Sequence, residues 1–278
     1  MLETVEIFLR RPERIRLKDA LRDNMNKLKT DTPFKALTGN KFKFRCHPGI
    51  PCFTECCADL NLVLTPYDVV RMKHTLKLSS QDFLERYTTT KMDRRSRFPM
   101  IHLKMTPDKH RTCPFVSPRG CRIYEDRPGA CRIYPLGRAA LKVNREPNTR
   151  EKFFVVAEKH CLGFQEEKEW TVDEWMKNEG VDEYNVMNDQ WLEIITSSMA
   201  LGPEKEVPRK IQMFLMASYN LDTFRQFVFK SKFFERFTVP SALKKKLAVD
   251  DIELMKFSFK WLKFSLFGER TLQIKPRY

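Results

Sequence analysis

The chain contains little glycine, only 9 of its 278 residues, and lacks both glycine-rich loops that bind nucleotides. Neither GxGxxG nor GxxxxGK followed by Ser or Thr occurs, so nothing supports a dinucleotide-binding fold or a P-loop. A run of about 18 apolar residues, which a membrane-spanning helix needs, is also missing. The first 16 residues are too charged for the apolar part of a signal peptide. We therefore expect a cytoplasmic protein with no transmembrane segment.

Cysteine is absent from the last 117 residues, although the chain contains eight. Cysteines that serve only as scattered core residues would be expected along the whole chain. In a cytosolic chain, a cluster of this kind favours a metal site over a disulfide framework. The predicted ligands are Cys46, Cys52, Cys56, Cys57, Cys113, Cys121, Cys131 and Cys161.

Thiolates are soft ligands for zinc, copper(I) and iron–sulfur clusters, and four of them complete one zinc site or one cluster. Eight thiols match two such sites by number, or one site plus free or catalytic thiols. The spacing Cys-x2-Cys, common in zinc sites, does not occur; the Cys52-x3-Cys56-Cys57 segment is closer to a compact loop around a cluster. Cys113-Pro114 resembles the proline-flanked cysteines of small iron–sulfur proteins. We expect an iron–sulfur cluster ahead of Zn²⁺, and we leave the neighbouring His47, His110 and His160 out of the ligand set.

Capping and periodicity predict several helices. Thr65 precedes a proline at the first helical position, Ser79 or Ser80 begins a second helix, and Thr171 opens a segment like a capping box. Short strands are predicted at 98–103 and 152–157, and a short helix between Phe8 and Leu21. The further helices are expected at about 171–179, 183–199, 208–218, 220–230, 239–248 and 250–267.

The motif Cys-Arg-Ile-Tyr occurs twice, beginning at Cys121 and at Cys131. In an extended chain, Cys and Ile would share one face and Arg and Tyr the other. Each copy could then direct one sulfur toward a metal.

The net charge of +15 is unevenly distributed. Residues 1–45 carry 12 basic and 6 acidic groups, residues 225–278 carry 13 and 5, and residues 151–190 reverse the sign with 4 and 11. A basic surface suits an acidic protein, nucleic acid or anionic lipid, or is simply solvated. Lys256, Lys260 and Lys263 would form a basic stripe on the last helix, which is either an amphipathic binding surface or the solvated face of a core helix.

The cysteine pattern resembles a known family. The residues are Cys46, Cys52-x3-Cys56-Cys57, Cys113-Pro-Phe, Cys121-Arg-Ile-Tyr-Glu-Asp-Arg-Pro-Gly-Ala-Cys131-Arg-Ile-Tyr-Pro and Cys161-Leu-Gly-Phe. Over about residues 42–165 they resemble the YkgJ-type cysteine-cluster family of zinc- or iron-chelating domains. The five residues between Cys46 and Cys52 exceed the two or three that the family more often has. The resemblance implies metal or iron–sulfur binding, and one branch, the flagellin lysine N-methylases, is enzymatic.

We therefore predict an α+β protein, mainly α, with a basic lead-in at 1–41, an irregular metal-nucleated cysteine-cluster domain at 42–165 and a helical domain at 166–278. One hypothesis is a redox or protein-lysine methyl-transfer enzyme that uses a cluster. The other is a non-catalytic, zinc-stabilised interaction module whose basic faces bind an acidic protein partner, with nucleic acid as a further candidate.

Overall fold

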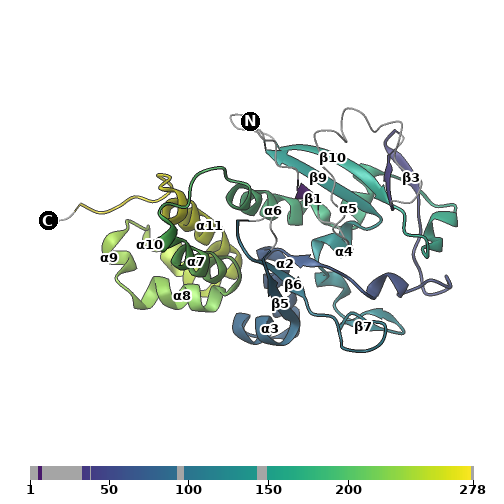
Figure 1. Cartoon of the computed structure of the whole chain (residues 1–278), viewed down its shortest axis with the longest axis horizontal. Coiled ribbons are helices and arrows are strands. Elements are labelled where there is room, and N and C mark those ends of the chain that lie inside the picture. The colour runs from purple at the N-terminus through teal and green to yellow at the C-terminus, as the bar shows by residue number, and fades with distance from the viewer. Residues whose placement is uncertain (1–5, 8–32, 38, 93–96, 143–148, 277–278) are drawn as a thin grey trace. The chain divides into compact units, whose positions relative to one another are not determined.

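The computed structural model describes residues 6–7, 33–37, 39–92, 97–142 and 149–276 (Figure 1). The mixed α+β class is confirmed, with small sheets in the N-terminal part and helices in the C-terminal region. The helix predicted between Phe8 and Leu21 lies outside the described residues. Within them, no helix is both long and apolar enough to cross a membrane.

The chain divides into two compact units that alternate along the sequence. The first unit comprises residues 1–62, 105–124 and 129–182, and the second comprises 63–104, 125–128 and 183–278. All eight cysteines belong to the first unit.

The first unit contains three small antiparallel sheets. The largest has the order β1-β9-β10-β2, formed by β1 (Glu6–Ile7), β9 (Leu136–Lys142), β10 (Thr149–Val156) and β2 (Phe34–Ala36). Figure 1 shows β9 and β10 side by side as its long central pair. The strand predicted at 152–157 is confirmed by β10. The other two sheets pair β3 (Lys41–Lys43) with β11 (Glu169–Thr171), and β7 (Val116–Ser117) with β8 (Gly120–Cys121).

Two short helices, α4 (Gly129–Ile133) and α5 (Val172–Asn178), close the core of the first unit. Thr171 caps α5, because its hydroxyl accepts from the Glu174 N–H at 3.2 Å while the Glu174 carboxylate accepts from the Thr171 N–H at 2.9 Å. Trp175 donates its indole N–H to the Ile133 carbonyl at 3.0 Å, which joins α5 to α4. The buried cluster around them consists of Phe42, Phe44, Ile133, Leu136, Val172, Trp175, Met176 and Val181.

The repeated Cys-Arg-Ile-Tyr motif does not form two equivalent extended segments, so that prediction is wrong. Cys121 ends strand β8, whereas Cys131 lies inside helix α4. Pro128 immediately precedes α4, and a proline is well tolerated at the start of a helix because it has no N–H to satisfy. The context of each copy, rather than the repeated motif, decides its conformation.

The second unit opens with a sheet of order β4-β6-β5 and two helices. The strands are β4 (Val63–Leu64), β6 (Met100–Leu103) and β5 (Thr88–Lys91), and β6 confirms the strand predicted at 98–103. The helices are α2 (Pro66–Leu76), capped by Thr65 in a full capping box, and α3 (Ser80–Tyr87), capped by Ser79. Both predicted helix starts are confirmed.

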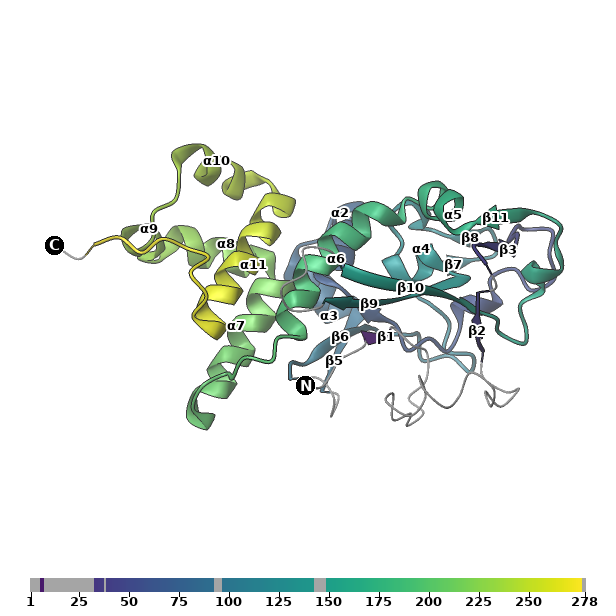
Figure 2. The ribbon, with the colours of Figure 1, turned by 90° about the horizontal axis from the view of Figure 1, so that it is seen from above.

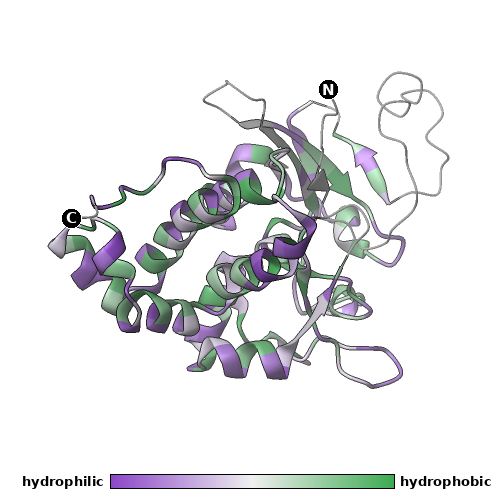
Figure 3. Cartoon of the chain, turned by 60° about the vertical axis from the view of Figure 1, so that its left-hand side comes forward, coloured by the Kyte–Doolittle hydropathy of each residue, from purple (hydrophilic) through white to green (hydrophobic). Residues whose placement is uncertain are grey.

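Five of the helices that follow in the described residues match predicted segments: α6 (Val181–Ile195), α7 (Val207–Tyr219), α8 (Leu221–Lys230), α10 (Ser241–Val249) and α11 (Asp251–Phe267). Helix α6 ends four residues before its predicted end at residue 199, and the short helix α9 (Phe233–Arg236) was not predicted. Figure 2 shows α11 beside α7 and α8. An aromatic contact joins α8 to α11, where the rings of Phe224 and Trp261 have centroids 5.3 Å apart. Hydrophobic and hydrophilic residues alternate along these helices, as expected when one side of each faces a core (Figure 3).

The predicted lysine stripe on α11 is partly neutralised. Lys256 pairs with Glu253 at 3.0 Å, and Lys263 forms an ion pair with Glu193. Lys260 is exposed. The opposite side of α11 is buried, so the helix is a core helix with a charged outer face.

Candidate metal centre

All eight cysteines lie in the described part of the chain, and none of them forms a disulfide. Cys46 is exposed and the other seven are partly exposed. They come from five places: a loop before β4, the segment before β7 with Cys113, strand β8 with Cys121, helix α4 and the turn after β10. The tertiary structure therefore decides which thiols become neighbours.

The loop that carries the first four cysteines is a series of tight turns. Ile50 donates to the carbonyl of His47 at 3.1 Å, Phe53 to that of Ile50 at 2.9 Å, and Glu55 to that of Cys52 at 3.1 Å. A short 3-10 helix, Glu55–Cys57, follows. Pro48, Gly49 and Pro51 suit such turns, because proline presets φ and glycine offers no side-chain obstruction.

Hydrogen bonds attach this loop to the turn around Cys161. The Arg45 N–H donates to the Gly163 carbonyl at 3.0 Å, and the Leu162 N–H donates to the Cys52 sulfur at 3.2 Å. A side chain on Gly163 would collide with the Phe44 ring, since its Cβ would lie 2.7 Å away. A glycine after Cys161-Leu162 therefore permits the close approach of the two segments.

The thiols near this junction influence one another. Partial burial, followed by the neighbouring thiols of Cys56, Cys161 and Cys52, raises the pKa of Cys46 to about 11. Burial also raises the pKa of Cys161, and the nearby Cys52 and Cys56 thiols add to that effect. We call Cys46, Cys52, Cys56 and Cys161 the Cys46 set.

A second group forms where the 3-10 helix meets the segment around Cys113. The Cys113 N–H donates to the Cys57 carbonyl at 2.7 Å, and Ala58 bridges to Thr112. The β7–β8 hairpin then brings Cys121 back toward Cys113, because Val116 pairs with Cys121 and also donates to the Cys113 carbonyl at 3.1 Å.

Within this second group, the thiols again share neighbours. A hydrogen bond with Cys56 and burial raise the pKa of Cys57, and the Cys131 and Cys113 thiols contribute further. Burial raises the pKa of Cys113, with an added contribution from Cys121. We call Cys57, Cys113, Cys121 and Cys131 the Cys57 set.

Tyr134 is a neighbour of the Cys46 set that sequence analysis did not place there. Its hydroxyl is buried and acts on Cys161, lowering the pKa of that thiol against the larger effect of burial. Its ring packs edge-on against Phe44, with centroids 5.9 Å apart. The only signal in the sequence is its position in the second copy of the repeat, three residues after Cys131.

The histidines near the cysteines have other contacts. His47 accepts the Gly49 N–H on Nδ1 at 3.2 Å and lies 3.5 Å from Glu166 through Nε2. His160 lies 3.4 Å from Glu158. Each of these two imidazoles therefore has a carboxylate as its neighbour.

The donor set fits a soft metal or an iron–sulfur cluster, because it consists of eight thiols free of disulfides. As the side chains are placed, no three Cys, His, Asp or Glu residues in the described ranges converge on a single metal position. Ligation would thus require side-chain rotation on a backbone that already brings the segments together.

Comparison with known proteins agrees with this chemistry. Neither the curated proteins nor the solved structures contain a significant match to the chain. Residues 45–162 match the model of the CxxCxxCC family, described as "Putative zinc- or iron-chelating domain". That range begins one residue before Cys46, ends one residue after Cys161 and contains both sets of thiols. The chain is therefore similar to this YkgJ-type family over residues 45–162, which make up less than half of its 278 residues.

Proposed function

We propose that residues 45–162 bind metal through two neighbouring centres, one held by the Cys46 set and the other by the Cys57 set, with iron–sulfur clusters as the favoured occupants. The observation that carries this proposal is the division at Cys56 and Cys57. These two residues are adjacent in the chain and are joined by a side-chain hydrogen bond, yet beyond that bond Cys56 acts on Cys46 and Cys161, whereas Cys57 is affected by Cys131 and Cys113.

The division makes chemical sense because four thiolates complete either one cluster or one tetrahedral zinc site. Neighbouring side chains in an extended chain point to opposite sides, so two adjacent cysteines serve two centres more easily than one. Cys113-Pro114 favours iron–sulfur over zinc by its resemblance to small iron–sulfur proteins.

The function of the centres depends on which occupant is bound. A cluster would supply electron transfer, consistent with a redox or protein-lysine methyl-transfer enzyme. Zinc would supply structural cross-links, consistent with a non-catalytic interaction module. Cys46 is the exposed member of its set, which favours a centre open to a small reductant.

Anaerobic purification of the full chain, followed by measurement of iron, acid-labile sulfide and zinc, tests the occupant. Two cubane clusters would give about eight iron atoms per chain and absorbance near 400 nm. Colourless protein with about two zinc ions per chain would select the interaction module. Protein that binds neither metal after reconstitution under reducing conditions would contradict metal binding itself.

Paired variants test the division. We expect Cys46→Ser/Cys161→Ser to lose the metal of the first centre and Cys113→Ser/Cys121→Ser that of the second, so that each retains about half of the total. His47→Ala/His160→Ala serves as the control and should retain all of it. Complete loss in both cysteine pairs, with the fold preserved by circular dichroism, would contradict two separate centres.

A further inference from the structure

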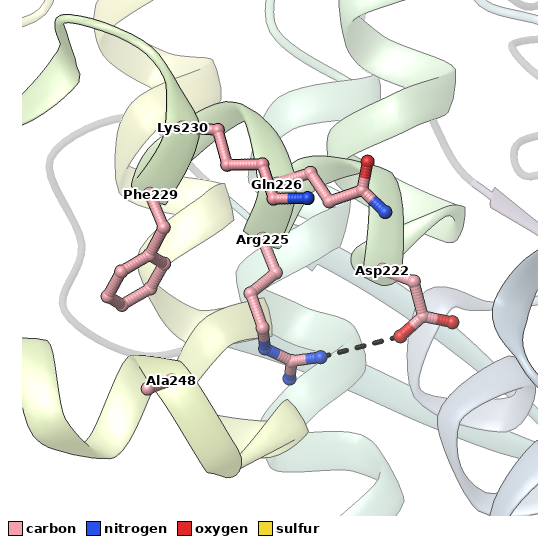
Figure 4. Close-up of a pocket in the computed structure, with 6 residues that line it drawn as sticks. All are labelled: Asp222, Arg225, Gln226, Phe229, Lys230 and Ala248. Atoms are coloured by element: carbon pink, nitrogen blue, oxygen red, sulfur yellow. Dashed lines mark hydrogen bonds and ion pairs between the residues drawn. The ribbon is translucent and has the colours of Figure 1, made fainter.

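A pocket on the second unit lies between helices α8 and α10 and has a volume of about 350 Å³. Figure 4 shows its lining: Asp222, Arg225, Gln226, Phe229 and Lys230 from α8, and Ala248 from α10. It contains no cysteine, and the proposed metal centres do not account for it.

One wall of the pocket is held by a network of ion pairs. Arg225 lies 3.4 Å from Asp222, also pairs with Asp251, and donates to the Leu247 carbonyl at 3.2 Å (Figure 4). The guanidinium therefore ties α8 to the end of α10 and to the start of α11. Because two carboxylates already compensate its charge, Arg225 shapes the pocket instead of attracting an anion.

The opposite side is apolar and accessible. The Phe229 side chain remains 38% exposed, which is unusual for so large a hydrophobic group, and it contacts Phe234 with centroids 5.2 Å apart. Ala248 is exposed, and its neighbour Val249 is 84% exposed. Together these residues offer a surface for one large apolar side chain.

The surroundings of the pocket are strongly basic. Between Arg225 and Val249 the chain has seven basic residues and a single acidic one, Glu235. Lys244 and Lys245 stand four and three positions before Ala248 and so share its face of α10. Lys244 lies 4.5 Å from the centre of the Phe234 ring. Lys230 and Lys245 are exposed, and neither has a carboxylate partner within the described ranges.

We propose that this pocket binds an acidic peptide segment, with one large apolar side chain against Phe229 and Ala248 and with flanking carboxylates beside Lys230 and Lys245. Isolated exposed ion pairs are weak, so the apolar anchor and several lysines must act together. Arg225 and Asp222 are paired with each other in the wall, so the pocket offers an apolar side chain the contacts of Phe229 and Ala248 but offers a phosphate backbone no uncompensated cation there. The exposed Gln226 amide is suited to hydrogen bonds with a peptide backbone.

Fluorescence anisotropy with the full chain tests this proposal. The probe is a fluorescein-labelled peptide of glutamates with one central Phe, and the comparison peptide has Ser at the centre. We expect the Phe peptide to bind more tightly, and Lys230→Glu/Lys245→Glu to weaken its binding by roughly tenfold or more. Phe229→Ser should remove the difference between the two peptides, because the anchor would lose its apolar contact.

The matched control is Lys104→Glu/Lys260→Glu, which makes the same charge change at exposed lysines that neither line the pocket nor lie on α8 or α10. It should weaken binding by less than about threefold. Equal losses in both pairs, or equal affinity for the Phe and Ser peptides, would overturn the proposal. Tighter binding to duplex DNA, or to vesicles rich in phosphatidylserine, than to the Phe peptide would also overturn it.

Discussion

The backbone N–H of Cys113 donates a hydrogen bond of 2.7 Å to the carbonyl of Cys57, although residues 63–104 of the other unit separate them in the sequence. This bond places Cys57 beside the β7–β8 hairpin. The preceding residue, Cys56, shares a side-chain hydrogen bond with Cys57 but is also a neighbour of Cys46 and Cys161. One peptide bond thus connects the two sets of thiols.

Replacement of the two adjacent cysteines should give unequal results. With two centres, Cys56→Ala should lose the centre of the Cys46 set and Cys57→Ala that of the Cys57 set, because each thiol has a different group of neighbours. If only one centre exists, only one of the variants should lose metal. Metal analysis and absorption spectra of both purified proteins check this. Loss of the same single centre in both variants would count against the division.

Removal of metal should loosen the cysteine-bearing segments of the first unit, residues 45–62, 105–124 and 129–162. The loop that carries the first four cysteines is a series of tight turns, so metal–thiolate bonds would supply much of the order. Chelation should therefore expose cleavage sites in limited proteolysis within these segments, while most of the far-UV helical signal persists. Addition of metal should restore resistance. Unchanged resistance of these segments in metal-free, reduced protein would show that the loops fold without a ligand.

The lysines of α11 should affect stability unequally and leave the metal content unchanged. Lys263 pairs with Glu193, so Lys263→Glu would place two carboxylates together and should lower the free energy of unfolding by about 1–3 kcal/mol. Lys260 is exposed, so Lys260→Glu should change the free energy of unfolding by less than about 0.5 kcal/mol.

Urea unfolding measures the stability of these two lysine variants. Metal analysis of the same samples checks that their metal content is unchanged. A folded triple Glu variant at Lys256, Lys260 and Lys263 that lacks metal would reveal a coupling between this helix and the thiols.

Asp251 should make the stability of the second unit dependent on pH. Its side chain is only 8% exposed, and burial alone would raise its pKa, but hydrogen bonds from Lys73 and Arg225 outweigh burial and hold the pKa well below its usual range. A carboxyl whose pKa is lower in the folded than in the unfolded state stabilises the fold above the unfolded pKa, which is about 3.9 for Asp. This contribution is lost as the pH falls from there toward the folded pKa.

Asp251→Asn should therefore cost about 1–3 kcal/mol at pH 7, because it removes one of the two carboxylates, Asp251 and Asp222, that Lys73 and Arg225 share. Urea unfolding of both proteins at pH 7, 5 and 3 provides the measurement. The difference between them should be the same at pH 7 and 5 and smaller at pH 3. A difference that does not change with pH would assign the effect to packing alone.

Local signals in the sequence predicted the helices well. Thr65 before Pro66 and Thr171 before Glu174 specify helix starts through contacts within a few residues, and the structure contains both caps. The repeated Cys-Arg-Ile-Tyr motif did not predict local structure, since Cys121 lies in a strand and Cys131 in a helix. A four-residue motif cannot choose between these conformations, because the neighbouring turn and core contacts outweigh its own preference.

The positions of the cysteines already indicate the type of ligand chemistry, since eight thiols confined to residues 46–161 favour soft-metal ligation. Apolar periodicity likewise predicts the helices of the last 117 residues, which contain no cysteine. Which thiols become neighbours, in contrast, follows from the folded arrangement of the segments. The hydrogen bonds from Leu162 to Cys52 and from Cys113 to Cys57 join segments that lie far apart in the chain. No local pattern encodes such pairings, because they depend on which segments the folded core brings together.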